Sequence, residues 1–242
     1  MKKIDINKLK INDDFDGGSF AVVRKCEYED NFYALKEFHE QSKAFTTNFI
    51  NKINSLSLIN NNSLVTPKIL VTKNDVPIAY LSKYIDGKIF DFLYNQTIAQ
   101  KISVLKKGKE KLLQMHEEGL IHSDIHYGNI MYNDNSVYFI DFDNCSYKRY
   151  KTKLNLTTDF AQEFIKKYGV CKEIDVAMFN YLTFSLVNSN SFFLTRNEII
   201  KQNYGYFYDN DSIKICNNLL LTEKYPTTDF LIDSIKRNVK YR

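Results

Sequence analysis

Residues 121–131 read Ile-His-Ser-Asp-Ile-His-Tyr-Gly-Asn-Ile-Met and carry the densest set of reactive side chains in the chain. Asp124 and Asn129 stand five residues apart, and the next apolar run ends in Asp141-Phe142-Asp143. Carboxylate and amide oxygens on loops beside short strands can hold Mg²⁺ and still leave an acid for a substrate. The pattern therefore predicts a magnesium site next to an acid, with an ordinary solvated turn as the alternative.

Six landmarks in chain order, spread over residues 16 to about 187, resemble the protein-kinase superfamily. The family has H-R-D with a following Asn, D-F-G, a glycine-rich loop, A-x-K and A-P-E. Asp16–Val23 resembles the glycine-rich loop, with Gly18 and Val23 matching, and Ala34-Leu35-Lys36 resembles A-x-K. His122-Ser123-Asp124 with Asn129 resembles H-R-D with its Asn, and Asp141-Phe142-Asp143 resembles D-F-G. Ala161-Gln162-Glu163 resembles A-P-E, and Asp175 stands at the start of a helix, as an aspartate does in the family. Their common order makes a chance match of all six improbable.

The resemblance implies one α+β catalytic domain over residues 1–242, with a bilobal kinase-like fold. We expect an N-lobe over about 1–83 with a small antiparallel sheet, a hinge at about 83–87, and a mainly helical C-lobe over about 88–242. A strand-rich first third followed by a helical remainder is typical of the same α+β class.

The local patterns predict where the elements fall. Turn residues between apolar runs predict two hairpins, and apolar spacing of three to four residues predicts helices. The expected elements are strands 22–28 and 32–38, helix 45–59, strands 68–72 and 78–84, a helix from Ile98 that ends at Gly119, strands 130–132 and 137–140, and a buried helix over 176–187.

The resemblance also implies ATP and Mg²⁺ as cofactors and assigns the site residues. Asp124 orients and deprotonates the acceptor hydroxyl, Lys36 contacts the α- and β-phosphates, and Asn129 and Asp141 hold the metal. The other nucleotide-binding residues implied are Gly17, Gly18 and Ser19 of the phosphate loop, Val23, Ala34 and Met131 around adenine, and the backbone of Lys83 and Ile85 at the hinge.

The chain departs from the family pattern at four places. Ser123 replaces the Arg that receives an activation-loop phosphate, so we expect activity without that phosphorylation. His126 and Asp143 are closer to small-molecule phosphotransferases of the aminoglycoside and choline type. The predicted helix 45–59 contains no Asp or Glu, so the usual carboxylate partner of Lys36 is missing. We therefore expect Asp141 and the phosphates alone to steer Lys36, rather than the nearby Glu40.

Composition adds limits on the class of protein. The chain has 242 residues, a formal net charge of +4 and 26% charged residues, without a dense basic run that indicates nucleic-acid binding. The four cysteines lie far apart, which predicts free thiols and a reducing compartment. The longest apolar stretch, 176–187, is too short to span a bilayer. We expect a cytoplasmic protein that binds neither membrane nor nucleic acid, and the sequence leaves export into another cell as an effector open.

Three functions remain open at this point. The first is a kinase that phosphorylates Ser or Thr of a protein substrate. The second, favoured by His126 and Asp143, is a small-molecule phosphotransferase. The third, favoured by the missing helix acid and the altered glycines, is a catalytically weak pseudokinase that serves as a binding module.

Overall fold

Two hairpins with tight turns form the centre of the N-terminal sheet. The computed structural model describes residues 1–17, 21–39, 44–152, 162, 165–166 and 169–188. In the turn between β3 (Ala21–Tyr28) and β4 (Asn31–Phe38), Glu29 and Asp30 have φ of 48° and 58°. Two positive φ values are what a two-residue hairpin turn needs to match the twist of the strands. Asn74 and Asp75, with φ of 50° and 62°, join the second hairpin in the same way. Both predicted hairpins are confirmed.

The sheet has six strands in the order β1-β5-β6-β4-β3-β2. The strands not yet introduced are β1 (Lys2–Asp5), β2 (Lys10–Gly17), β5 (Pro67–Lys73) and β6 (Val76–Lys83). All neighbours are antiparallel except β1, which pairs with β5 in parallel. The sheet is therefore mainly antiparallel, as expected, and the parallel edge strand β1 is an addition that was not predicted from the sequence.

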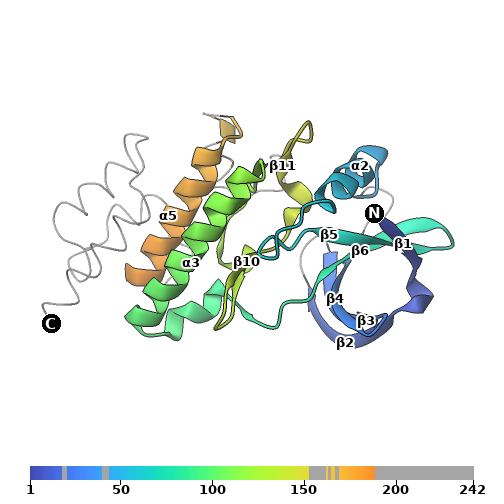
Figure 1. Cartoon of the computed structure of the whole chain (residues 1–242), viewed down its shortest axis with the longest axis horizontal. Helices are drawn as coiled ribbons and strands as arrows, with labels where there is room; N and C mark the ends of the chain where they lie inside the picture. The colour runs from blue at the N-terminus through green and yellow to red at the C-terminus, as the bar shows by residue number, and fades with distance from the viewer. Residues whose placement is uncertain (18–20, 40–43, 153–161, 163–164, 167–168, 189–242) are drawn as a thin grey trace, which may run out of the picture. The chain divides into compact units, whose positions relative to one another are not determined.

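The sheet is strongly curled (Figure 1). Its two edge strands, β1 and β2, are joined by only residues 6–9, which include the 3₁₀ turn η1 (Ile6–Lys8). Five steps of about 4.8 Å separate the edges of a flat six-stranded sheet, or ~24 Å, whereas such a short connection spans less than ~18 Å. The short connection therefore requires the curl.

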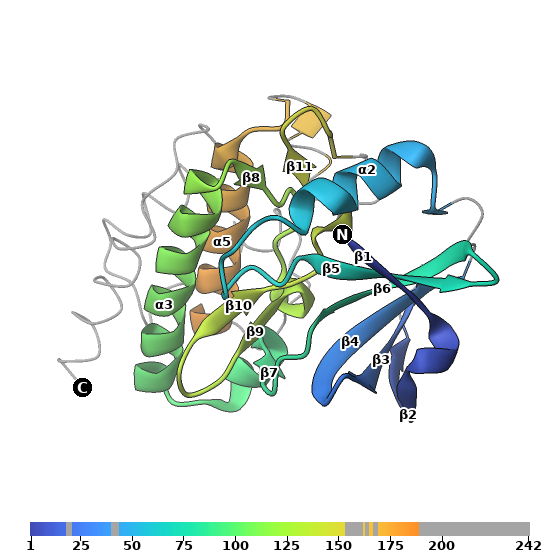
Figure 2. The same cartoon turned by 45° about the vertical axis from the view of Figure 1, so that its right-hand side comes forward.

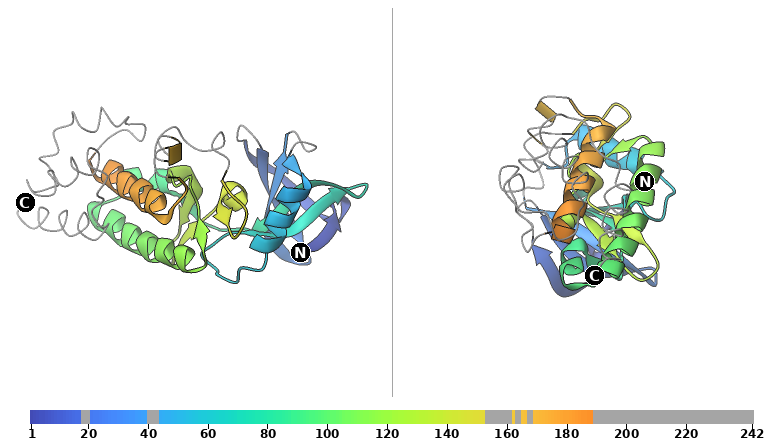
Figure 3. Two further views of the ribbon diagram at one scale, coloured as in Figure 1. Left: turned by 90° about the horizontal axis from the view of Figure 1, so that it is seen from above. Right: turned by 90° about the vertical axis from the view of Figure 1, so that its left-hand side faces the viewer.

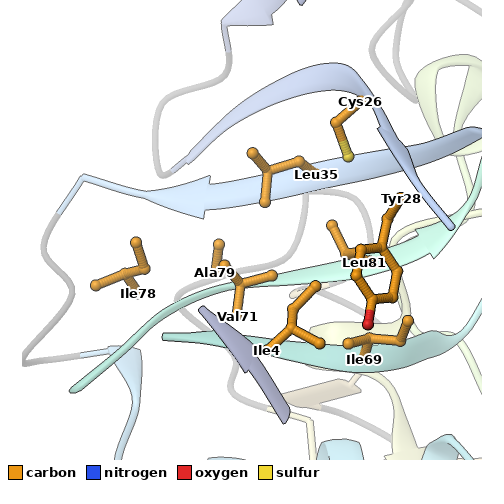
Figure 4. Packing of buried hydrophobic residues seen from close by; sticks show 9 residues of the cluster. All are labelled: Ile4, Cys26, Tyr28, Leu35, Ile69, Val71, Ile78, Ala79 and Leu81. Atoms are coloured by element: carbon orange, nitrogen blue, oxygen red, sulfur yellow. The ribbon is translucent and has the colours of Figure 1, made fainter. Parts of the chain in front are cut away.

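The concave side of the sheet holds the core of this part of the chain (Figure 4). Alternation along β4 sends Leu35 into the cluster and the neighbouring residues, including Lys36, to the other face. The buried members of the cluster are Ile4, Cys26, Tyr28, Leu35, Ile69, Val71, Ile78, Ala79 and Leu81.

The helix that follows the first hairpin is α2 (Thr47–Leu56), shorter than the predicted 45–59. The side chain of Thr46 accepts a hydrogen bond from the backbone N–H of Phe49 and so caps the first turn. Figure 2 shows α2 lying against β5, with Ile53 and Leu56 buried.

Two long helices pack side by side in the C-terminal part (Figure 3). In α3 (Ile98–Glu117), Thr97 and Gln100 form a reciprocal capping box at the start, and Gly119 with φ of 77° follows the end. In α5 (Lys172–Asn188), buried residues occur on all sides of the described part, as expected for a helix enclosed by protein. Both predictions are confirmed.

Short elements connect these helices. They are β7 (Lys88–Ile89), η2 (Phe90–Asn95), β8 (Leu120–Ile121), η3 (Tyr127–Asn129), β9 (Ile130–Tyr132), β10 (Val137–Phe139), η4 (Phe142–Asn144) and β11 (Ser146–Tyr147). β9 and β10 agree with the predicted strands. The two-residue strands were missed because two residues carry no readable alternation.

By its contacts the chain divides into two compact units. The first unit holds Met1–Gly87 and the short segment Phe139–Asp143, and the second holds Lys88–Tyr138 and the chain from Asn144 onward. The α+β class expected from the sequence is confirmed.

Candidate active site

Lys36 forms ion pairs with two carboxylates that are more than a hundred residues away in sequence. Its Nζ contacts Asp141, and it lies 2.9 Å from Oδ2 of Asp143. The Lys36 and Asp143 side chains are only 15% and 14% exposed, so this pair is largely shielded from water. Asp141 agrees with the sequence-based expectation, but the expectation that Asp141 is the only protein partner was wrong.

The pKa values of Lys36 and Asp143 depend on each other and on Asp141. Burial by itself lowers the pKa of Lys36, but Asp143, Tyr80 and Asp141 outweigh it, so this pKa lies well above its usual value. The pKa of Asp143 is raised to about 6, chiefly by burial and next by the charge of Asp141, while Lys36 acts in the opposite direction. At pH 7 Lys36 is therefore protonated and Asp143 is mostly ionised.

The segment Phe139–Asp143, which contains both acids, is held in the first unit by backbone hydrogen bonds. The N–H of Phe139 donates to the carbonyl of Ser63, and the N–H of Val65 donates to the carbonyl of Phe139, both at 2.9 Å. Lys52 of α2 is buried and donates to the carbonyl of Asp143 at 2.7 Å. Asp141 has φ of 65°, an unfavourable backbone for a residue with a Cβ, which the surrounding bonds hold in place.

Two of the expected nucleotide-binding residues share a face with Lys36. Val23 lies directly opposite Lys36 in the β3–β4 ladder, and Ala34 precedes Lys36 by two residues on the same strand. Small and branched apolar side chains next to an ammonium group suit a purine with its phosphates.

The remaining expectations for the first unit concern loops and backbone. Gly17 pairs with Val22 as the last residue of β2, so it belongs to a strand rather than to a loop. Gly18 and Ser19 lie outside the described residues. Lys83 ends β6 opposite Tyr33, and Ile85 is buried just after it.

The 121–131 stretch forms a tightly bonded loop in the second unit. The Asn129 side-chain N–H donates to the backbone carbonyl of Asp124 at 2.9 Å and lies 3.5 Å from its carboxylate. Nδ1 of His126 accepts the N–H of Gly128 at 3.1 Å, and its Nε2 is 3.8 Å from the Asp124 carboxylate. A Cβ at position 128 would lie 3.0 Å from the His126 ring, so glycine fits this turn.

Asp175, from the first turn of α5, holds the start of this loop. Its carboxylate accepts the backbone N–H groups of His122 and Ser123, each at 2.7 Å, and lies 3.0 Å from Nε2 of His116. Asp175 is fully buried, and Ser123 has φ of 66°. The carboxylate thus fixes a strained backbone one residue before Asp124.

The hydroxyl of Ser123 also takes part in a small network. It accepts a hydrogen bond from Oγ1 of Thr152 at 2.9 Å, and Oγ1 of Thr152 lies 3.0 Å from the hydroxyl of Ser146. A neutral hydroxyl therefore stands at the position where the family pattern has an arginine.

The expected site residues fall into two groups. Val23, Ala34, Lys36 and Asp141 lie in the first unit, whereas Asp124, Asn129 and Met131 lie in the second. Met131 pairs with Ile89 in the β7–β9 ladder. The motif residues Ala161 and Glu163, like Glu40, lie outside the described residues.

Sequence reasoning missed the part played by two residues. Asp143 was noted only as a departure from D-F-G, and Lys52 was not noted. The available signal was the combination of a second acid two residues after Asp141 and a helix without acids.

Comparison with known proteins is consistent with these motifs. A family model described as Protein kinase domain matches residues 13–241. A search of curated proteins found no match. Within the described residues, no helix combines the length and the apolar character needed to cross a membrane. In the same residues, no three His, Cys, Asp or Glu side chains cluster as a metal site.

Proposed function

Because the chain belongs to the protein kinase family, with its bilobal α+β fold, we propose that it transfers the γ-phosphoryl group of ATP to a Ser or Thr hydroxyl of a protein. The observation that carries the proposal is the ion pair between Lys36 of β4 and Asp141. These are the two residues that the A-x-K and D-F-G patterns assign to the phosphates and the metal. On this proposal the lobes are residues 1–83 and 88–242, joined at 83–87.

In this reaction the protein positions the reactants and stabilises charge, and it forms no covalent bond with the phosphoryl group. The bond between the γ-phosphorus and the β-γ bridging oxygen breaks, a bond from phosphorus to the acceptor oxygen forms, and the hydroxyl proton passes to the Asp124 carboxylate. Asn129 holds the Asp124 backbone through its amide N–H, which supports a fixed orientation of that carboxylate. Lys36 neutralises phosphate charge, which favours the transition state.

The oxygen donors present fit Mg²⁺. Asp141 offers a carboxylate and Asn129 an amide oxygen, and this hard cation is commonly bound by one or two such groups together with substrate phosphates. A complete cage of protein ligands is therefore not required. When bound, the ion would draw charge from the phosphate oxygens.

The proposal also assigns the nucleotide contacts. Val23, Ala34 and Met131 would contact adenine, the backbone of Lys83 and Ile85 would bond the purine edge, and Gly17, Gly18 and Ser19 would contact the phosphates.

His126 supports a second candidate, phosphorylation of a small-molecule hydroxyl. Its Nε2 lies 3.8 Å from the Asp124 carboxylate, and its pKa is lowered, chiefly by burial. The sequence His126-Tyr127-Gly128-Asn129, which is closer to small-molecule phosphotransferases than to protein kinases, is the feature that favours this candidate.

Transfer from [γ-³²P]ATP tests these candidates. Label in protein supports the proposal, label in a small metabolite supports the second candidate, and absence of transfer with nucleotide binding supports a binding module. Asp124→Ala should abolish transfer and leave nucleotide binding intact, since its role is proton acceptance. Asp141→Ala should also remove Mg²⁺-dependent binding. Asp134→Asn, at an exposed acid of the second unit, is the matched control and should change neither.

Equal loss of nucleotide binding in Asp124→Ala and Asp141→Ala, with folding preserved, would contradict the separate roles.

A further inference from the structure

The helix α2 carries a buried cation where the family needs an anion. In protein kinases the strand lysine is held by a glutamate of the adjacent helix, and activity requires that ion pair. Here α2 has no acid, and its buried residues are Lys52, Ile53 and Leu56. A lysine cannot replace the glutamate as a partner of Lys36, because two like charges repel, so the carboxylate must come from another element.

Asp143 is in the position to supply that carboxylate. One of its carboxylate oxygens lies 2.9 Å from Nζ of Lys36, and its carbonyl accepts the bond from Lys52 at 2.7 Å. A single residue thus contacts both lysines, one through its side chain and one through its backbone. With Asp141, the four groups sum to zero formal charge, which suits a largely buried cluster.

Asp141 is poorly suited to hold Lys36 by itself. Its oxygens are the ones proposed to bind the metal, so a lysine that depended on Asp141 alone would compete with the ion. Glu37 follows Lys36 on the strand, faces the other side, and pairs with Arg24 at 3.3 Å. Among the described residues, Asp143 is therefore the acid suited to hold Lys36 once Asp141 is engaged.

We propose that Asp143 is the positioning residue of Lys36, and that its carboxylate replaces the helix glutamate while Lys52 ties α2 to the same residue. The inference rests on the proposed function for its catalytic consequence. The ion pair itself exists in the nucleotide-free chain and is testable there.

The first test measures how fast an amine-reactive anhydride modifies Lys36, with mass spectrometry of the nucleotide-free protein. Asp143→Asn keeps the shape and removes the charge, so labelling of Lys36 should rise about fivefold or more. Asp143→Glu should keep labelling close to the wild-type rate, as a conservative rescue. Lys68, which donates to two carbonyls in the same unit, is the internal control and should not change.

The second test moves the carboxylate back to the helix. Lys52→Glu added to Asp143→Asn should restore protection of Lys36 and recover part of the turnover at saturating ATP. Asp143→Asn alone should lower that turnover about tenfold, with a smaller change in KM, because the lysine is misplaced while the pocket remains.

Unchanged labelling of Lys36 in Asp143→Asn, with Lys68 also unchanged, would overturn the proposal. An equal rise at both lysines would also overturn it, since Asp143 would then support the fold rather than position Lys36. The proposed function fails differently: wild-type protein would transfer no phosphate, and MgATP would not slow labelling of Lys36.

Discussion

Asp175 is the buried acid on which the geometry of the 121–131 loop depends. Its carboxylate accepts two backbone N–H groups at 2.7 Å and faces His116 at 3.0 Å. A buried donor left without an acceptor costs about 1–3 kcal/mol. Asp175→Asn keeps one acceptor oxygen but turns an NH₂ group toward a backbone N–H. We therefore expect the free energy of unfolding to fall by about 1–3 kcal/mol. Asp175→Ala removes all acceptors and should cost about 3–6 kcal/mol, allowing for non-additivity.

Such a loss is a large part of the ~5–15 kcal/mol that stabilises a typical domain. Urea unfolding gives the free energy, and amide hydrogen exchange gives the local effect. Exchange at His122 and Ser123 should accelerate more than exchange in the middle of α3, because these N–H groups lose their acceptor. Asp134→Asn, an exposed acid of the same unit, is the control. An Asp175→Asn protein with an unchanged unfolding midpoint and unchanged exchange at both amides would refute this reasoning.

Four further predictions concern packing, thiol reactivity, pH and regulation. Gly108→Ala should lower the melting temperature by the equivalent of about 1–2 kcal/mol, because the new Cβ would lie 2.8 Å from the buried Phe179 ring and overpacking outweighs the helix-propensity gain; Phe179→Leu should reverse part of it. Burial raises the pKa of Cys26 to about 11, so iodoacetamide at pH 8 should modify it only after unfolding, as mass spectrometry will detect. The pKa of His126 is lowered in the folded chain, chiefly by burial, so on acidification the unfolded chain takes up the proton first. The free energy of unfolding should therefore fall as the pH drops below ~6.5. Urea titrations at pH 7.5 and 5.5 should show this decline, and His126→Gln should make it smaller. Ser123 offers no charge to a phosphate, so phosphatase treatment should leave turnover unchanged; a large drop would contradict this.

The elements that the sequence predicts well are those with strong local signals. The hairpin from Ala21 to Phe38 has apolar runs around a two-residue turn of Glu29 and Asp30. The helix α3 has an apolar face, a capping box and a terminal Gly119. In these cases the interactions that define the element lie within one short continuous stretch of the chain, so the pattern is sufficient.

Other features depend on partners that are distant in sequence. β1 is four residues long and becomes a strand only because the curled sheet brings β5 beside it. Its residues Lys2 to Asp5 hold too few positions for a readable alternation. The short strand β8 likewise exists only through its pairing with β11.

The features of the candidate site also fall into those that the sequence predicts and those that depend on distant partners. The sequence by itself determined the family motifs, and with them the expected roles of Lys36, Asp124, Asn129 and Asp141. Only the tertiary structure decided that Asp143 holds Lys36, that Lys52 joins α2 to Asp143, and that Asp175 carries the backbone of the loop. The reason is physical: a motif records which side chains are present, whereas an ion pair between residues 36 and 143 depends on how the folded chain closes the distance between them.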